Sequence, residues 1–175
     1  IDDAVYTTSY GYDLSGKQTQ MTYPDDYQVN RIYYPGTNLL QKVYGVTDFV
    51  EYALMTGYEP TGKMGQVDHG NGTTTVHAYD RWSTRLASIL TQGPDGSGGS
   101  IDLQNRSYQY LPSGDIETIA HAVKNVTYTY TYDALHRLTS ETNTGTYDPI
   151  SYTYDAIGNI TSKTVGTDDF VYTYG

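Results

Sequence analysis

Two copies of one phrase, 22 residues apart, lie near the end of the chain. The letters YTYD at residues 130–133 return at residues 152–155, and an aliphatic residue, Leu138 or Ile160, follows the Asp of each copy. A period of roughly 20–50 residues is typical of repeat proteins, in which each unit needs its neighbours to bury apolar surface. This periodicity constrains the fold more strongly than any other feature of the sequence.

The same spacing extends along almost the whole chain. A Tyr that ends a stretch of alternating residues recurs every 20 to 24 residues, apart from one interval of 31. These residues are Tyr12, Tyr34, Tyr58, Tyr79, Tyr110, Tyr132, Tyr154 and Tyr174. The long interval contains QGPDGSGGS at 92–100, whose composition predicts a loop insertion. We therefore expect residues 1–175 to form a single array of about seven repeats, a fragment of a larger protein.

The residues after each Tyr match a type I turn, which favours Asp at the first position, Pro at the second and Gly at the fourth. Residues 13–16 and 155–158 have both the Asp and the Gly, 59–62 and 111–114 have Pro and Gly without the Asp, and 80–83 and 133–136 lack the Gly. We assign structural repeat positions to Tyr10, Tyr12, Asp13, Gly16, Tyr58, Gly62, Tyr79, Asp80, Tyr110, Gly114, Tyr130, Tyr132, Asp133, Leu138, Tyr152, Tyr154, Asp155, Gly158 and Ile160.

Alternating residues flank these turns. Tyr128, Tyr130 and Tyr132 share one side of an extended segment, with Thr residues on the other side. The sequence predicts an all-β fold of tandem antiparallel β-hairpins, each of about 22 residues, which form a coiled sheet. A closed hollow barrel and an arc of a larger β-shell both fit this pattern. Residues 81–90 fit a short helix or a strand equally well, and no other segment suggests a helix.

Composition excludes several classes of protein. The formal net charge is −10, which argues against nucleic-acid binding, and no segment is apolar enough to span a bilayer. The chain contains 21 Tyr but two Phe, so we expect thin and partly hydrated packing in which hydroxyl groups need partners. The absence of Cys excludes disulfides and thiolate-bound metals.

The candidates for chemistry are better explained as structure. Asp13, Asp80, Asp133 and Asp155 could be catalytic carboxylates, but a turn already explains their position. His69, His77, His121 and His136 lack the spacing of metal ligands, the loops at 68–72 and 166–169 lack the ligand order of a calcium loop, and residues 93–99 lack the Lys of a phosphate loop. We expect no catalytic residue, no metal and no cofactor, while stacking of sugars on Tyr stays open.

These motifs resemble the YD repeats of the Rhs family, which also occur in the C components of bacterial Tc toxins and in teneurins. The matching phrases are YGYDLSGKQT at 10–19, YTYDALHRL at 130–138, YTYDAIGNI at 152–160 and HGNGTTTVHAYD at 69–80. The resemblance implies a long sheet that coils into a hollow shell, which encloses a toxic segment in the bacterial relatives. The self-cleaving D-P-x-G motif of many Rhs proteins is not matched, because Ile150 and Ser151 follow Asp148-Pro149.

The leading interpretation is a non-catalytic segment of a β-shell wall that encloses or displays another polypeptide. The alternatives are an adhesion module that binds a glycan or protein and, more remotely, a β-rich hydrolase. Expected partners are the remainder of the parent polypeptide and an enclosed toxin segment, and the open sheet edges predict edge-to-edge self-association. We expect a secreted or cell-surface location, in bacteria.

Overall fold

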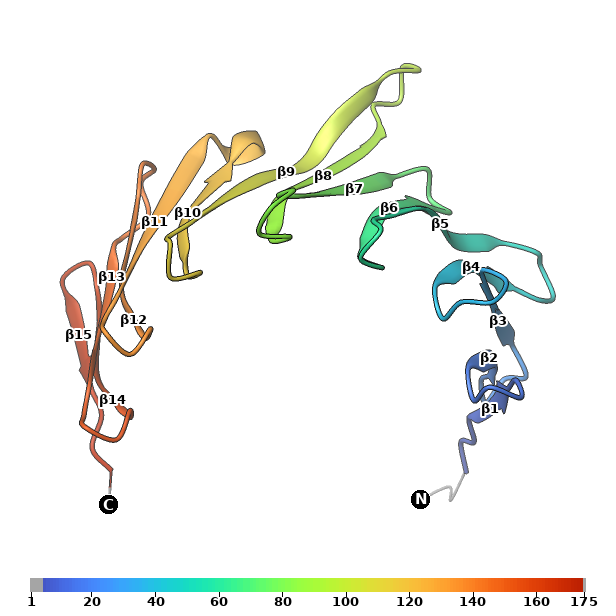
Figure 1. The fold of residues 1–175 in the computed structure, drawn as a ribbon, viewed down its shortest axis with the longest axis horizontal. Helices are drawn as coiled ribbons and strands as arrows, with labels where there is room; N and C mark the ends of the chain where they lie inside the picture. Colours follow the sequence, from blue (N-terminus) through green and yellow to red (C-terminus); the bar gives the residue numbers. More distant parts are fainter. Residues whose placement is uncertain (1–4, 175) are drawn as a thin grey trace. The chain divides into compact units, whose positions relative to one another are not determined.

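The computed structural model describes residues 5–174 and is built almost entirely from β-strands. Fifteen strands form one open antiparallel sheet, and each strand pairs with the strands that precede and follow it in the sequence (Figure 1). The predicted fold class, tandem antiparallel hairpins in one sheet, is therefore confirmed. In the described residues, no helix is long and apolar enough to cross a membrane.

The chain divides into two compact units, Ile1–His77 with Thr91–Asp102 and Ala78–Leu90 with Leu103–Gly175. The first unit holds β1 Ser9–Tyr12, β2 Gln18–Thr22, β3 Gln28–Tyr33, β4 Leu40–Gly45, β5 Glu51–Tyr58, β6 Met64–His69 and most of β7 Thr74–Tyr79. The second holds β10 Ile116–His121, β11 Val126–Tyr132, β12 Leu138–Asn143, β13 Ile150–Tyr154, β14 Ile160–Val165 and β15 Asp168–Val171. Residues of β8 Leu86–Pro94 and β9 Ser100–Tyr110 belong to both units.

A turn follows each periodic Tyr from Tyr12 to Tyr154 and joins the two strands of a hairpin. The turns that follow the periodic Tyr residues join β1 to β2, β3 to β4 and so on to β13 and β14, and the return strands begin at Met64, Ile116, Leu138 and Ile160 as the repeat spacing predicts. In most of these hairpins the strand pairing shifts register beside the turn, for example between Thr131 and Tyr132. A β-bulge therefore accompanies the turn, which the sequence did not predict.

The segment 92–100 was predicted as a loop. This prediction is wrong for residues 92–94 and 100, which belong to strands. Strand β8 runs to Pro94 and β9 starts at Ser100, so the extra residues lengthen a hairpin. Asp95 closes the short turn, because its Oδ1 accepts hydrogen bonds from the backbone N–H groups of Ser97 and Gly99 at 2.7 and 2.9 Å. A bond of 2.9 Å from Gln92 Nε2 to Asp102 Oδ1 then joins the two extended strands.

Three smaller differences concern helices and the C-terminal repeat. Residues 86–90 are strand, so the alternative of a helix over 81–90 is excluded. A short 3-10 helix at Ala122–Lys124, η1, was not expected. Tyr172 and Tyr174 follow the last strand instead of lying in it, although the Tyr172 N–H still bonds to the Thr161 carbonyl at 3.0 Å. Gly175, which follows the last periodic Tyr, lies outside the described residues.

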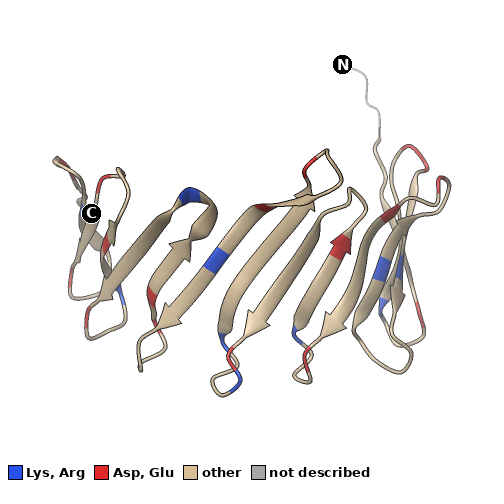
Figure 2. Cartoon of the chain, turned by 90° about the horizontal axis from the view of Figure 1, so that it is seen from above, with Lys and Arg blue, Asp and Glu red and all other residues tan. Residues whose placement is uncertain are grey.

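The hydrophobic core is thin, as the Tyr-rich composition predicts. Among the described residues only three apolar side chains are buried: Met55, Val67 and Val126. The strand pairing separates two faces in the second unit, with Tyr128, Tyr130 and Ile119 on one face and Thr129, Thr131 and Ser140 on the other. Charged residues lie mostly in the turns and at strand ends, while most of each strand is uncharged (Figure 2). Hydrogen bonds therefore contribute much of what holds neighbouring strands together.

Candidate functional site: the contacts between neighbouring repeats

The turn after each periodic Tyr has a recurrent geometry. At residues 13–16, 34–37, 59–62, 111–114, 133–136 and 155–158, the N–H of the fourth residue bonds to the carbonyl of the first at 2.8 to 3.2 Å. Gly16, Gly62, Gly114 and Gly158 occupy the fourth position with φ between 79° and 104°. A side chain is strained in this left-handed region, which explains the Gly of the motif. His136 adopts φ 61° at the same position without being Gly.

The turn Asp side chains accept backbone hydrogen bonds. Asp155 Oδ1 accepts from the N–H groups of Ile157 and Asn159 at 3.0 and 2.8 Å, and Asp133 Oδ1 accepts from Leu135 and Arg137 at 2.9 and 3.0 Å. These bonds hold the loop in the turn conformation. Asp80 differs, because its carbonyl accepts the N–H of Thr84, one residue further on, in a wider turn.

The same hydrogen bonds determine how the turn carboxylates ionise. Bonds from Ser15 and then Lys17 lower the pKa of Asp13, the Arg137 side chain lowers that of Asp133, and the Ser83 N–H lowers that of Asp80. A general acid must hold a proton near neutral pH, so lowered pKa values do not suit these groups to that role. Each of these Asp residues also lies in its own turn.

A hydrogen bond from the periodic Tyr links one repeat to the repeat before it. The Tyr154 hydroxyl donates to the carbonyl of Leu138, the first residue of β12, at 2.7 Å, and the Tyr132 hydroxyl donates to the carbonyl of Ile116 at 2.9 Å. Equivalent bonds reach back from Tyr58, Tyr110 and Tyr174 to the carbonyls of Leu40, Leu86 and Ile160. Near the second turn, Tyr33 makes this bond to Gln18 in place of the periodic Tyr34, whose hydroxyl donates to the Met55 carbonyl at 2.7 Å. Sequence reasoning missed these bonds, although the 21 Tyr against two Phe were a signal that the hydroxyl is used.

Basic side chains at the end of a turn cover the Tyr ring of the next repeat. The Arg137 guanidinium lies 4.5 Å from the centroid of the Tyr154 ring, and it also bonds to Asp133 Oδ2 at 2.6 to 2.7 Å and to the Asp155 carbonyl at 3.2 Å. Lys17 over Tyr33 and Arg85 over Tyr110 repeat this placement at 5.3 and 5.5 Å. These contacts are cation–π interactions. They bury one side of rings that otherwise would be free to stack on sugars.

Two turns of the second unit also meet directly. His136 Nδ1 lies 2.6 Å from Asp115 Oδ2, although the two residues are 21 positions apart. Asp115 raises the pKa of His136, and His136 in turn lowers the pKa of Asp115 with help from Ser113. Each partner thus favours the charged form of the other, and protonation of His136 makes the contact an ion pair.

Hydroxyl groups bond to each other across the opposite face of the second unit. Thr131 Oγ1 lies 2.8 Å from Thr139 Oγ1 and 2.7 Å from Ser140 Oγ, because the bulge in β12 places both residues against Thr131. Thr153 makes the same pair of contacts with Thr161 and Ser162. This face is therefore polar and already hydrogen-bonded within itself.

Other residues that the sequence singled out make local hydrogen bonds or are exposed on a strand. In the first unit, the Asp68 carboxylate accepts hydrogen bonds from Gln66, Thr74 and Thr56, and within residues 5–174 no three His, Asp or Glu side chains gather as metal ligands. His69 lies 3.2 Å from Thr75 Oγ1, and Tyr10 and Tyr12 are more than half exposed on β1.

The second unit contains an unexpected pair of basic side chains. His121 lies directly opposite Arg106 on the neighbouring strand, and both have a buried nitrogen without a hydrogen-bond partner. Burial, then the charges of Arg106 and Lys124, lower the pKa of His121, so its neutral form is favoured. Sequence reasoning assigned no partner to this residue.

The fold and these contacts define a class: a repeat protein in which each hairpin is held by its neighbours through turns and Tyr hydroxyls. Over 94 residues the chain is 31% and 29% identical to the toxin subunits YenC1 and YenC2 of Yersinia entomophaga. Both matches cover 47% of this chain and 10% of the relative, so the chain spans about a tenth of the length of these subunits. No protein-family model matches the chain.

Solved structures of toxin complexes share the fold. The Tc holotoxin pore of Photorhabdus luminescens superposes with a TM-score of 0.76 at 21% identity, covering 94% of this chain and 9% of that one. The TcdB2–TccC3 crystal structure gives 0.76 at 21% identity, over 96% of this chain and 10% of that one. The chain is thus related in sequence to bacterial toxin subunits and has the fold of a segment within Tc toxin structures.

Proposed function

We propose that this chain is a YD-repeat segment that builds part of the wall of a toxin-related β-shell, and that the wall encloses or displays another polypeptide. The observation that carries the proposal is the bond from a periodic Tyr to a carbonyl of the preceding repeat, which Tyr58, Tyr110, Tyr132, Tyr154 and Tyr174 all make. Such bonds make each repeat complete only beside its neighbour, which suits a continuous wall. Similarity to toxin subunits supports the same role.

The function is structural and not enzymatic. Turn residues such as Asp155 and Gly158 shape the turns, and periodic Tyr residues such as Tyr132 and Tyr154 join the repeats. The polar groups of the turns are already used in hydrogen bonds, which leaves them poorly suited to bind and convert a substrate. The partners are the remainder of a longer, secreted bacterial polypeptide and a segment that the wall encloses.

Limited proteolysis of the polypeptide that carries this chain tests the proposal. In a variant with both Tyr132→Phe and Tyr154→Phe, the wall opens more often, and trypsin cleaves the enclosed segment faster than in the wild type. The matched control is Tyr152→Phe, because the described structure shows no hydrogen bond for that hydroxyl. A wild-type protein in which no segment outside this array is protected from trypsin would contradict an enclosing role.

A further inference from the structure

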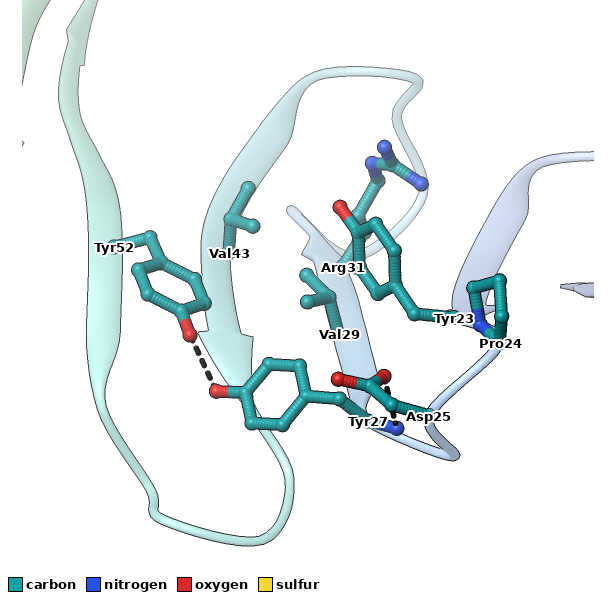
Figure 3. A pocket seen from close by; sticks show the side chains of 8 residues that line it. All are labelled: Tyr23, Pro24, Asp25, Tyr27, Val29, Arg31, Val43 and Tyr52. Carbon is teal, nitrogen blue, oxygen red and sulfur yellow. Dashed lines mark hydrogen bonds between the residues drawn. The ribbon is translucent and has the colours of Figure 1, made fainter. Parts of the chain in front are cut away.

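A groove of about 750 Å³ lies over strands β3, β4 and β5 and the turn before β3 in the first unit, and the hydrogen bonds of the periodic Tyr residues do not involve its lining (Figure 3). Its lining consists of Tyr23, Pro24, Asp25, Tyr27, Val29, Arg31, Val43 and Tyr52. This volume falls within the roughly 300–1,000 Å³ that is typical of ligand sites. The groove is therefore large enough to receive a short stretch of polypeptide.

Apolar side chains form the floor and aromatic rings form the sides. Val29 and Val43 lie on neighbouring strands, and Arg31 lies directly opposite Val43 on the same face of the sheet. Figure 3 shows Tyr52 on one side of the groove and Tyr23 on the other. Both Tyr side chains are 40% exposed, so an apolar side chain that entered the groove would remove aromatic surface from water.

One end of the groove is fixed by hydrogen bonds among its own residues. The Tyr27 hydroxyl donates to Asp48 Oδ2 at 2.8 Å and contacts the Tyr52 hydroxyl. It lies over Gly45, where the Cβ of any other residue would collide with Tyr27 and Asp48. The contact with Tyr52, then burial, raises the pKa of Tyr27, so the Tyr27 hydroxyl keeps its proton. These polar groups already have partners.

Arg31 is different. Its Nη1 is the one buried side-chain nitrogen or oxygen among the described lining residues that has no hydrogen-bond partner. A buried guanidinium donor without an acceptor is costly, and a carboxylate is the group that matches it best. A doubly charged phosphate suits the groove less than a singly charged carboxylate, because the Asp25 carboxylate also lines the groove and repels the greater charge more strongly.

We infer that this groove binds an extended peptide segment in which an acidic residue is flanked by aliphatic residues, with its carboxylate on Arg31 and an aliphatic side chain between Tyr23 and Tyr52. The inference goes beyond the wall role, because it concerns a groove on one face and not the continuity of the sheet. A sugar is a weaker match, since the floor is aliphatic and the hydroxyls of the fixed end are engaged with each other.

An NMR titration of the full chain tests this inference with two probes, acetyl-Leu-Asp-Leu-amide and acetyl-Leu-Asn-Leu-amide. The Asp peptide shifts the amide signals of Val29, Arg31 and Val43 saturably, and the Asn peptide binds about tenfold more weakly because it lacks the charge. Equal affinity for the two peptides, or no saturable shift at these residues, overturns the inference. Saturable shifts with methyl glucoside alone overturn it as well.

Two Arg variants separate binding from stability. Arg31→Gln lowers the affinity for the Asp peptide by about tenfold and leaves the affinity for the Asn peptide unchanged. Arg106→Gln is the matched control, because Arg106 also has a buried nitrogen without a partner but lies in the other unit. Should Arg31→Gln unfold the chain, the comparison of the two peptides on the wild type still decides the question. Evidence against the proposed wall function would leave the peptide-binding result unaffected.

Discussion

The Tyr154 hydroxyl donates a 2.7 Å hydrogen bond to the carbonyl of Leu138, the residue that opens the second strand of the preceding repeat. The carbonyl lies beside the bulge that shifts the register of β11 and β12, where strand pairing is interrupted. A Tyr hydroxyl thus supplies a donor to a backbone group that the bulge disturbs. This relationship explains why the motif requires Tyr and not Phe.

Replacing Tyr154 with Phe removes this donor and leaves the ring in place. We expect the free energy of unfolding to fall by about 1 kcal/mol, the usual net contribution of one hydrogen bond. Urea unfolding followed by circular dichroism measures the change. Tyr152→Phe, in the same strand, is the control and should change stability by less than about 0.5 kcal/mol. Equal effects of the two changes would show that the hydroxyl bond to Leu138 contributes nothing.

The Asp155 side chain organises its turn through two backbone N–H groups, those of Ile157 and Asn159. Asp155→Ala removes both acceptor contacts and should lower the urea midpoint more than Tyr154→Phe does. Asp155→Asn keeps one acceptor oxygen and should lie between Asp155→Ala and the wild type. Glu59→Ala, at the first position of an equivalent turn that has Pro60, should have little effect. A Glu59→Ala loss as large as that of Asp155→Ala would contradict this account.

The turn Gly and the start of the return strand were visible in the sequence because they depend on local geometry. A turn that needs a left-handed residue selects Gly158, and the strand that follows begins at Ile160 in the structure as the spacing predicts. The carbonyl groups that accept hydrogen bonds from the Tyr hydroxyls could not be identified from the sequence. Leu138 accepts through its backbone, so its side chain carries no trace of the bond, and the distance to Tyr154 depends on how two hairpins pack.

Composition misled the prediction at residues 92–100. Gly, Pro and Asp residues are depleted in strands, and the segment was therefore predicted as a loop. In the structure, backbone bonding from Asp95 to Gly99 closes a turn, and strands reach Pro94 and Ser100 on either side. Pairing of two long strands outweighs the weak local preferences. Such pairing depends on both strands at once, so the local sequence of one strand does not predict it.

Arg137 joins three parts of two repeats and is hard to replace. Its guanidinium lies over the Tyr154 ring and bonds to Asp133 and to the Asp155 carbonyl. We expect Arg137→Lys to lower the free energy of unfolding by about 1 kcal/mol, because Lys keeps the charge but not the planar fork. Thermal unfolding in low salt measures this. Arg81→Lys is the control, since Arg81 lies over Trp82 within a single turn. A fully tolerated Arg137→Lys would show that charge alone is sufficient.

The contact between His136 and Asp115 makes stability depend on pH. Asp115 raises the pKa of His136, so the contribution of the His is fully present below its ordinary value of 6.5 and is lost as the pH rises through the raised value. His136 lowers the pKa of Asp115, so the contribution of the Asp is present above 3.8 and is lost as the pH falls through the lowered value. Both contributions are therefore present together between pH 3.8 and pH 6.5.

The variant His136→Asn tests this dependence without straining the turn, because Asn tolerates the left-handed conformation that His136 adopts with φ 61°. The difference in urea midpoint between wild type and variant should be largest near pH 5, inside the window set by the two pKa shifts, and should shrink toward pH 9 and toward pH 2. Asp115→Asn should abolish the same pH dependence, since the contact needs both charges. A difference that stays constant from pH 5 to pH 9 would mean that His136 stabilises the turn by packing alone.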